Sequence, residues 1–185
     1  MPNQPSNIVV RIETPDNHDR IREVTIDAFA QSDFGHNGEA DLVDALRASE
    51  QCLSLVACRD AEVVGHILFS PAFIRTHDSE LAGMALAPMS VATEYQRQGI
   101  GSLLINTGLE RLSIQGCPYV IVLGHPEYYS RFGFQLAAEI GVAHGFNGIT
   151  QEVFFIRSLG DGTLKPKNDG RAYYDSAFGP QHEPP

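Results

Sequence analysis

The chain has 185 residues, of which 43% are hydrophobic and 19% are charged, a composition that supplies a folded core and lacks the charge excess of a disordered chain. Its 13 basic and 23 acidic residues give a formal charge of -10, opposite in sign to the footprint of a protein that binds nucleic-acid phosphates. The most apolar run, residues 81–92, is too short to span a bilayer. Residues 1–7 lack the basic and apolar regions of a secretory signal, so we expect one cytoplasmic domain over residues 1–185, with no membrane partner.

The first elements are predicted to be a strand and a helix. Hydrophobic residues alternate over residues 8–13 as in a half-buried strand. The core side is expected to hold Ile8, Val10 and Ile12, and the solvent side Val9, Arg11 and Glu13. Capping oxygens and a proline over residues 14–16 then precede apolar positions at three-and-four spacing, which predicts an amphipathic helix that ends near Phe29.

A loop over residues 31–38 leads to a short second helix that ends near Arg47. The apolar runs at residues 53–58 and 63–74 are separated by a four-residue polar turn, which indicates an antiparallel hairpin. Another apolar run, residues 83–91, contains Pro88, which has no N–H to donate to a ladder. We therefore expect this strand to be interrupted at the proline.

Residues 99–115 carry apolar side chains around most of a helical projection, which predicts a helix that packs against a sheet. The short apolar run 119–123 follows, so the centre of the chain is a strand–helix–strand unit whose two strands should be parallel. One or two helical turns at 127–131 and strands at 134–136 and 153–159 complete the ordered elements. A polar loop over 165–171 and a flexible tail over 179–185 are expected beyond them.

The three cysteines, Cys52, Cys58 and Cys117, are odd in number and include no CxxC pair. Neither a disulfide framework nor a zinc site is indicated. They are better interpreted as small hydrophobic residues, and no metal is expected.

The most informative segment is Gln96-Arg97-Gln98-Gly99-Ile100-Gly101, which lies between the interrupted strand and the start of the buried helix. The first turn of a helix has backbone N–H groups without internal partners, and glycines allow a phosphate to approach them closely. The segment lacks the third glycine of a dinucleotide fingerprint and the Gly-Lys-Ser/Thr ending of a Walker A loop. By itself, a glycine pair at this place is equally consistent with close packing of helix and sheet.

Its context resembles the GNAT superfamily of acyl-CoA-dependent N-acyltransferases, whose signature is Gln/Arg-x-x-Gly-x-Gly/Ala between a bulged fourth strand and the third helix. The resemblance implies that coenzyme A is held by Arg97, Gln98, Gly99, Ile100, Gly101 and Ser102, and that the pantetheine arm lies along Met89, Ser90 and Val91. It also implies a mixed α/β (α+β) fold with a mostly antiparallel sheet of about seven strands, about four helices, and a splayed parallel pair formed by the strands at 83–91 and 119–123.

A second segment, residues 124–134, resembles the late Tyr-x-x-x-Gly-Phe element of the same family, with Tyr129 at its tyrosine. The fuller string Pro-x-Tyr-Tyr-x-Arg-Phe-Gly-Phe is similar to the YhbS-like branch of predicted bacterial acetyltransferases, and Arg171-Ala-Tyr-Tyr near the end of the chain also fits that branch. The resemblance implies transfer of an acetyl group from acetyl-CoA to a primary amine.

The departing thiolate of such a reaction needs a proton, and a phenol is a plausible donor. We therefore predict that Tyr129 is the general acid, with Tyr128 as a spare candidate and core packing as the alternative role of Tyr129. The general base stays open among Glu94, His125, Glu127 and water, because the strand at 83–91 has no titratable side chain.

The acceptor is not specified by the sequence. Acidic residues such as Asp33, Glu39, Asp41 and Asp44 would attract a cationic amine, but such clusters are usually solvated faces. His66 is interpreted as a buried core histidine, and His36 stays unassigned. The partner is a small-molecule or peptide amine, and a homodimer is possible. The rival hypothesis is a non-catalytic acyl-CoA-binding or sensing module.

Overall fold

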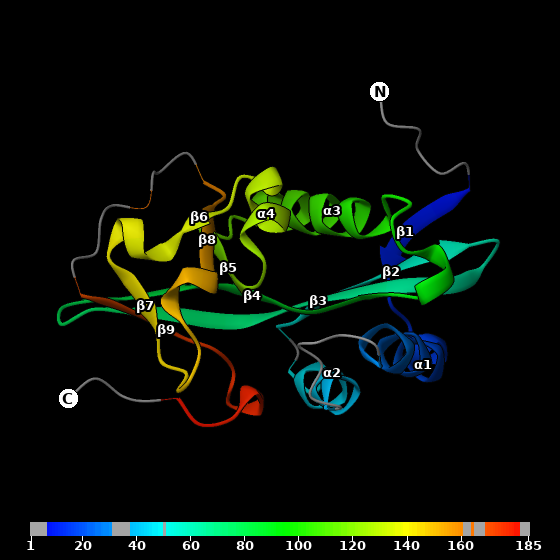
Figure 1. The fold of residues 1–185 in the computed structure, drawn as a ribbon, viewed down its shortest axis with the longest axis horizontal. Coiled ribbons are helices and arrows are strands. Elements are labelled where there is room, and N and C mark those ends of the chain that lie inside the picture. The colour runs from blue at the N-terminus through cyan, green and yellow to red at the C-terminus, as the bar shows by residue number, and fades with distance from the viewer. Residues whose placement is uncertain (1–6, 31–37, 50, 161–163, 165–168, 182–185) are drawn as a thin grey trace. The chain divides into compact units, whose positions relative to one another are not determined.

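A computed structural model of the chain describes residues 7–30, 38–49, 51–160, 164 and 169–181. The chain divides into two compact units, one made of residues 1–69 and 88–108 and the other of residues 70–87 and 109–185. Three elements contribute to both units, namely strands β3 (Glu62–Arg75) and β4 (Glu80–Val91) and helix α3 (Ile100–Ile114). Neither unit is therefore a continuous stretch of chain (Figure 1).

The first unit is an antiparallel arrangement of strands with helices on both faces. Strand β1 (Ile8–Ile12) pairs with β2 (Leu53–Arg59), and β2 pairs with β3, in registers that place Val10 opposite Ala57 and Leu55 opposite Ile67. Helices α1 (His18–Phe29) and α2 (Glu39–Arg47) lie below these strands, and the start of α3 lies above them (Figure 1). The helices bury the apolar stripes that the sequence predicts, formed by Ile21, Val24, Ala40, Val43 and Leu46.

The turn between β2 and β3 has two residues with positive φ, Asp60 at 47° and Ala61 at 72°. Two such residues in a two-residue loop are typical of the primed hairpin turns, whose twist matches that of the flanking strands. The predicted antiparallel hairpin is confirmed.

The end of β1 differs from the predicted alternation. Ile12 is 55% exposed, whereas the side chain of Glu13, predicted to face solvent, is only 10% exposed. Arg47 Nε donates to Glu13 Oε1 at 2.7 Å, and the Ser54 hydroxyl donates to Glu13 Oε2 at 2.6 Å. His66 Nε2 lies 2.8 Å from Ser54 Oγ. The prediction was wrong here because three buried polar partners hold the Glu13 carboxylate on the inner side.

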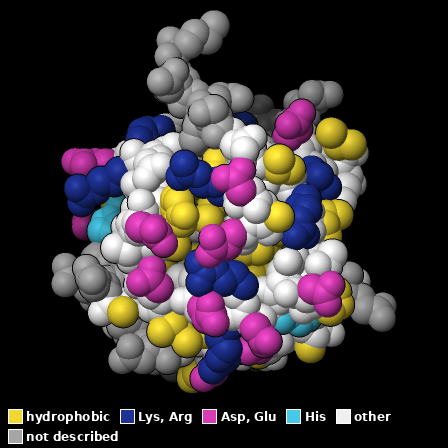
Figure 2. Space-filling view, turned by 90° about the vertical axis from the view of Figure 1, so that its right-hand side faces the viewer, with side chains coloured by type: hydrophobic (Ala, Val, Ile, Leu, Met, Phe, Trp, Pro, Cys, Tyr) yellow, Lys and Arg dark blue, Asp and Glu magenta, His cyan; other side chains and the backbone are white. Residues whose placement is uncertain are grey.

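Ion pairs cover the outward faces of α1 and α2. Arg22 contacts Asp41 at 2.6 Å and Asp44 at 2.7 Å, and Arg20 contacts Glu62 at 2.7 Å. Basic and acidic side chains are accordingly interspersed over the face shown in Figure 2. The acidic residues of α2 thus form a paired, solvated surface, while Asp33 and His36 lie outside the described residues.

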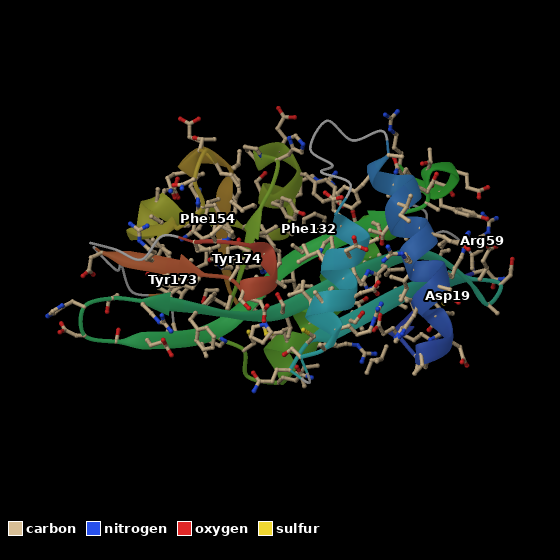
Figure 3. All side chains as sticks on the ribbon, turned by 90° about the horizontal axis from the view of Figure 1, so that it is seen from below. Asp19, Arg59, Phe132, Phe154, Tyr173 and Tyr174 are labelled. Carbon is tan, nitrogen blue, oxygen red and sulfur yellow. The ribbon has the colours of Figure 1, made fainter. Side chains whose placement is uncertain are left out.

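The second unit contains two parallel strand pairs among its described residues. Strand β4 pairs with β5 (Tyr119–Leu123), placing Met84 opposite Val120 and Ala85 opposite Ile121. Strand β5 pairs antiparallel with β8 (Phe154–Ser158), and β8 with β6 (Gln135–Leu136). Strand β9 (Gly170–Tyr173) pairs antiparallel with β3 and parallel with β7 (Val142–His144). Tyr174 follows Tyr173 directly at the end of β9 (Figure 3).

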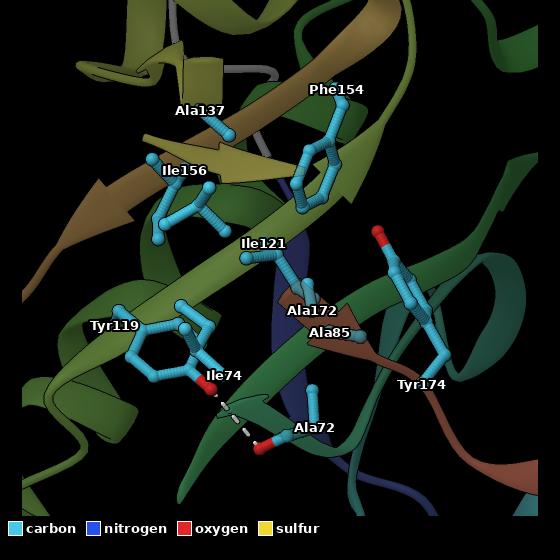
Figure 4. Close-up of a cluster of buried hydrophobic side chains, with 11 residues drawn as sticks. Ala72, Ile74, Ala85, Tyr119, Ile121, Ala137, Phe154, Ile156, Ala172 and Tyr174 are labelled. Carbon is cyan, nitrogen blue, oxygen red and sulfur yellow. Dashed lines mark hydrogen bonds between the residues drawn. The ribbon is translucent and has the colours of Figure 1, made fainter. Parts of the chain in front are cut away.

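The core of the second unit is built from the inner side chains of these strands (Figure 4). Its buried members are Ala72, Ile74, Ala85, Tyr119, Ile121, Ala137, Val142, Phe154, Ile156, Ala172 and Tyr174. At the crowded base of this core, a Cβ on Gly83 would lie 2.4 Å from the Tyr119 ring. A glycine is therefore required where β4 passes the tyrosine.

The predicted fold class is confirmed: the sheet is mixed and mostly antiparallel and includes the predicted parallel β4/β5 pair, and the described residues form four α-helices. These residues form nine strands rather than about seven, because the short strands β7 and β9 were not expected. Two local predictions were wrong. Strand β4 continues through Pro88, which is buried in place, and Arg171 lies in β9 rather than in a polar loop.

Within the described ranges, no helix is long and apolar enough to cross a membrane. The same ranges contain no group of three or more His, Cys, Asp or Glu residues that is able to hold a metal ion. All three cysteines are free thiols, with Cys58 buried and the other two half-buried. His66 is fully buried, as predicted.

Candidate active site

The connection from β4 to α3 is tied to the first unit by backbone hydrogen bonds. The Ala92 N–H donates to Val64 O at 2.9 Å. The next amide, that of Thr93, donates to the Asp27 carboxylate of α1 at 2.7 Å. A 3-10 turn, Thr93–Tyr95, begins there. The path of the chain into the glycine segment is thus fixed from both the sheet and the first helix.

Two glutamine side chains hold the segment itself. Gln96 Nε2 donates to Val91 O at 3.0 Å, and Gln98 Nε2 donates to Glu94 O at 3.0 Å. Between and after them, Arg97 has φ of 60° and Gly99 has φ of 86°. Left-handed residues in such a turn direct successive N–H groups toward one side, which makes a concavity for an anion.

Helix α3 begins directly after this turn. Its first backbone hydrogen bond runs from the Leu103 N–H to Gly99 O at 3.0 Å, so the amides of Ile100, Gly101 and Ser102 precede the helical ladder. They lie at the positive end of the helix dipole. A Cβ on Gly99 would meet no atom within 4 Å, so the space beside the turn is open. The arrangement fits a diphosphate.

The strand end before the turn is packed from below. Ser90 is buried, and its hydroxyl lies 3.2 Å from the Thr25 hydroxyl of α1. A Cβ on Gly65 would lie 3.2 Å from both Ile100 and Leu104 and 3.3 Å from Ser90 O. The close approach of α3 to β3 therefore depends on a glycine. Met89 and Val91 are half-buried beside Ser90.

A surface cavity of about 500 Å³ opens in the first unit beside the 3-10 turn. Its lining residues are Arg20, Glu23, Val24, Asp27, Ala92, Thr93 and Glu94. Arg20 is paired with Glu23 at 2.9 Å, and Asp27 is bonded to the Thr93 amide. Of the three candidate bases, Glu94 is the one that lies at this cavity.

Tyr129 lies in the second unit, at the end of the short helix α4 (Pro126–Tyr129). Its side chain is 9% exposed and contacts the rings of Tyr128 and Phe134 edge to face, with centroids 5.2 and 5.7 Å away. A Cβ on Gly124 would lie 2.2 Å from the Tyr129 ring, so the glycine after β5 makes room for the phenol. Burial raises the pKa of Tyr129 well above its ordinary value, and the hydroxyl keeps its proton.

The other candidates around α4 are more exposed. His125 and Glu127 are exposed at the start of the helix, and Tyr128 is half-buried with the Arg131 guanidinium 4.7 Å from its ring centroid. The nine predicted coenzyme-binding residues, Met89 to Val91 and Arg97 to Ser102, belong to the first unit, and Tyr129 belongs to the second. The meeting of phenol and turn therefore stays a prediction.

Three residues that hold the turn, the end of β4 and the core of the second unit were not identified from the sequence. Asp27 orients the turn, Thr25 pairs with Ser90, and Tyr174 is a buried tyrosine of the core around Phe154. A hydroxyl on the apolar stripe of the first helix was the one available signal, because a polar residue there needs a buried partner.

Comparison with known proteins agrees with this architecture. Residues 19–134 match the model of the acetyltransferase (GNAT) family. The match covers more than half of the chain, and the chain belongs to this family.

The chain is 36% identical to YhbS of Escherichia coli K12 over 159 residues, which are 85% of this chain and 90% of YhbS. It is 46% identical to YjhQ of the same organism over 122 residues, and this match spans 64% of each protein. Both relatives are described as uncharacterized N-acetyltransferases. The predicted resemblance to the YhbS-like branch is thereby confirmed.

Two solved structures are similar over nearly the whole chain. The crystal structure of Escherichia coli YhbS in complex with CoA superposes with a TM-score of 0.82 and 32% identity, covering 95% of this chain and 94% of that one. A GNAT family acetyltransferase from Brucella melitensis in complex with acetyl-CoA gives a TM-score of 0.76 and 35% identity, covering 94% and 99%.

Proposed function

We propose that this protein is an N-acetyltransferase that moves an acetyl group from acetyl-CoA to a primary amine by direct attack through a tetrahedral intermediate. The observation that carries the proposal is the turn before α3, where left-handed Arg97 and Gly99 precede the amides of residues 100–102 beside open space. The CoA and acetyl-CoA held by two similar proteins support the choice of ligand.

In this proposal, the pyrophosphate of acetyl-CoA accepts hydrogen bonds from the backbone N–H groups of residues 97–102. These N–H groups and the positive end of the helix dipole stabilise its negative charge. The backbone of Met89, Ser90 and Val91 lies along the pantetheine arm. The Ser90 side chain takes no part in this binding, because its hydroxyl is hydrogen bonded to the Thr25 hydroxyl.

The chemical step needs two proton transfers. The attacking amine must be neutral, and the thiolate that leaves must gain a proton. Tyr129 donates this proton in the proposal. Burial raises the pKa of its phenol, and a thiolate formed in the same buried setting is also a stronger base, because loss of solvent disfavours its charged form.

The base is left open among Glu94, His125, Glu127 and water. All three side chains are exposed, and each would act on an amine that arrives from solvent. A small-molecule or peptide amine remains the acceptor class, and the cytoplasm and a homodimer remain expectations.

The direct test is an acceptor screen with acetyl-CoA that follows the release of free thiol. With an acceptor in hand, Tyr129→Phe should lower kcat about a hundredfold and leave the affinity for acetyl-CoA close to native, because general acid catalysis acts in the transition state. Tyr128→Phe is the matched control and should keep its rate. A Tyr129→Phe protein that turns over normally when chemistry is rate-limiting would remove Tyr129 from the mechanism.

A second candidate function is a non-catalytic acyl-CoA-binding or sensing module. The observation that favours it is the close packing of Tyr129 on Gly124 and Phe134, which a purely structural tyrosine would also show. A chain that binds acetyl-CoA and releases no thiol with any acceptor would support it.

A further inference from the structure

The Tyr174 hydroxyl is buried and has no hydrogen-bond partner within the part of the chain that the structure describes. Its side chain is 6% exposed, and its ring lies between Phe146 and Phe178, with centroids 5.2 and 5.1 Å away. Native proteins pair nearly all of their buried polar groups. This unused donor therefore calls for an explanation.

Tyr119, in the same core, shows the ordinary arrangement. Its hydroxyl lies within reach of two carbonyl oxygens, Leu81 O at 2.9 Å and Ala72 O at 3.2 Å (Figure 4). The core thus holds two large buried tyrosines, one with its hydroxyl hydrogen bonded and one without.

Tyr174 is not loosely placed. Its backbone N–H donates to Gln181 Oε1 at 2.8 Å, and Gln181 Nε2 donates back to Tyr174 O at 3.0 Å. Between them, the Asp175 carboxylate accepts from the Ala177 N–H at 2.8 Å and starts a 3-10 turn. These contacts hold the backbone of Tyr174 in place.

The natural acceptor for a buried hydroxyl is a group of the protein itself. The hydroxyl points toward the end of β5 and Phe154 (Figure 4). Phe154 is the register partner of Leu123, and the next residue, Gly124, lies against the Tyr129 ring. Burial raises the pKa of Tyr174, and a negative charge on Tyr129 would raise it further, so Tyr174 stays protonated whenever Tyr129 is ionised.

We propose that Tyr174 is a positioning residue whose hydroxyl donates a hydrogen bond to the Tyr129 oxygen after that oxygen has given up its proton. This inference rests on the proposed role of Tyr129. The Tyr129 O–H bond breaks, the proton joins the CoA sulfur as the C–S bond breaks, and the electron pair stays on the phenolate oxygen beside Tyr174. The proton lost by the attacking amine then restores the phenol.

The first test sets stability against activity. Tyr174→Phe should keep or raise the thermal midpoint, because it removes an unpaired hydroxyl, yet lower kcat about tenfold or more, the effect of one hydrogen bond to a charged oxygen, with the KM for acetyl-CoA unchanged. Tyr119→Phe should lower the midpoint by about 2 °C or more, because two carbonyls lose their donor, and keep its rate well below that midpoint. Tyr173→Phe, next in the chain and stacked under Arg75 at 5.0 Å, should change neither.

The second test separates this inference from the proposed function. Combining Tyr174→Phe with Tyr129→Phe should cost no more rate than Tyr129→Phe alone, because Tyr174 acts through the Tyr129 oxygen. With acetyl-selenocoenzyme A, whose selenol leaves without needing a proton, the Tyr174→Phe deficit should shrink.

Three results would overturn the inference. A thermal midpoint that falls in Tyr174→Phe as far as in Tyr119→Phe would mean that the hydroxyl already has a partner, such as a buried water. A normal kcat in Tyr174→Phe beside an impaired Tyr129→Phe would reject the role of Tyr174 and leave that of Tyr129 standing. A normal kcat in both variants would reject both roles.

Discussion

Two buried polar arrangements in this protein make opposite use of their hydrogen bonds. In the first unit, Glu13 accepts from Arg47 and Ser54, and His66 lies beside Ser54, so a charged cluster is almost fully paired. In the second unit, the Tyr174 hydroxyl is neutral and buried, and it has no hydrogen-bond partner among the residues that the structure describes. The difference teaches that paired buried groups stabilise the fold, whereas an unpaired one in a rigid setting is a candidate for function.

The cluster around Glu13 also assigns a histidine tautomer. A carboxylate only accepts, so the Ser54 hydroxyl hydrogen goes to Glu13 at 2.6 Å. Ser54 Oγ must then accept from His66 Nε2, 2.8 Å away. His66 Nδ1 is consequently the unprotonated nitrogen and the one atom of the cluster without a partner among the described residues. Leaving a buried acceptor nitrogen without a partner destabilises the fold less than leaving a buried N–H without one. Burial lowers the pKa of His66, although the Glu13 carboxylate acts in the opposite direction.

The largest expected effect comes from breaking the paired cluster. Glu13→Gln keeps the shape of the side chain but removes the buried charge that faces Arg47, whose guanidinium retains Asp44 as a more exposed counter-charge. It should lower the free energy of unfolding by about 3 kcal/mol, the low end for a buried pair. Glu80→Gln, which removes the partner of Arg75 in a half-exposed pair, should cost less than about 1 kcal/mol. Urea unfolding measures both. Equal losses in the two variants would contradict the comparison.

Acid should weaken the same cluster. Burial alone would raise the pKa of Glu13, but hydrogen bonds from His66, Arg47 and Ser54 lower it to about 2. A lowered pKa stabilises the fold above the unfolded value and loses that effect as the pH falls, so about 3 kcal/mol should disappear between pH 4.5 and 2. Burial lowers the pKa of His66, so this residue adds a loss that begins below pH 6.5. Unfolding curves across this range should slope downward toward acid, and Glu13→Gln should flatten the steep lower part.

A smaller effect on stability is expected from alanine substitutions of the two glycines that flank α3, and only one of them should also weaken the binding of acetyl-CoA. Gly99 and Gly116 have φ of 86° and 78°, and a Cβ on either would meet nothing within 4 Å. Alanine at each place should cost about 1–2 kcal/mol of backbone strain. Saturating acetyl-CoA at about 100 times its dissociation constant should stabilise the native chain by about 2.7 kcal/mol. Gly99→Ala should lose much of that increment, whereas Gly116→Ala should keep it. Thermal shift with and without acetyl-CoA decides between them.

The smallest of these effects concerns the hydroxyl pair under the strand end. Ser90→Ala leaves the buried Thr25 hydroxyl without its partner and should cost about 1 kcal/mol, because the contact is long at 3.2 Å and joins two neutral hydroxyls. Adding Thr25→Val removes the buried hydroxyl and should recover most of the loss. A double variant less stable than Ser90→Ala alone would show that the pair contributes through packing rather than through its hydrogen bond.

Much of this organisation is predictable from local sequence. Apolar spacing predicts α1 and α2 because each buries one regular face. The more continuous apolar runs predict α3 and β5, and the first four residues of β5 are all buried. The glycine segment is predictable because its conformation is determined within a few residues, by Gln96, Gln98 and the helix start.

The parts that were missed depend on distant partners. Thr25 and Ser90 are 65 residues apart, and Glu13 turns inward because of Arg47 and Ser54. Strand β9 follows a polar stretch and is held by pairing with β3 and β7. Nothing in Ala172-Tyr173-Tyr174 tells which tyrosine faces solvent and which is buried.

The turn after β2 is a place where a single substitution should make the protein more stable. Ala61 sits at φ of 72°, a conformation that alanine adopts at a cost and glycine adopts freely. Asp-Gly is the preferred pair for this kind of hairpin turn. Ala61→Gly should therefore raise the free energy of unfolding by about 1 kcal/mol, and urea unfolding would detect it. The gain would come without touching any residue proposed to act in acetyl transfer, so this hairpin is a suitable place to begin stabilising the protein.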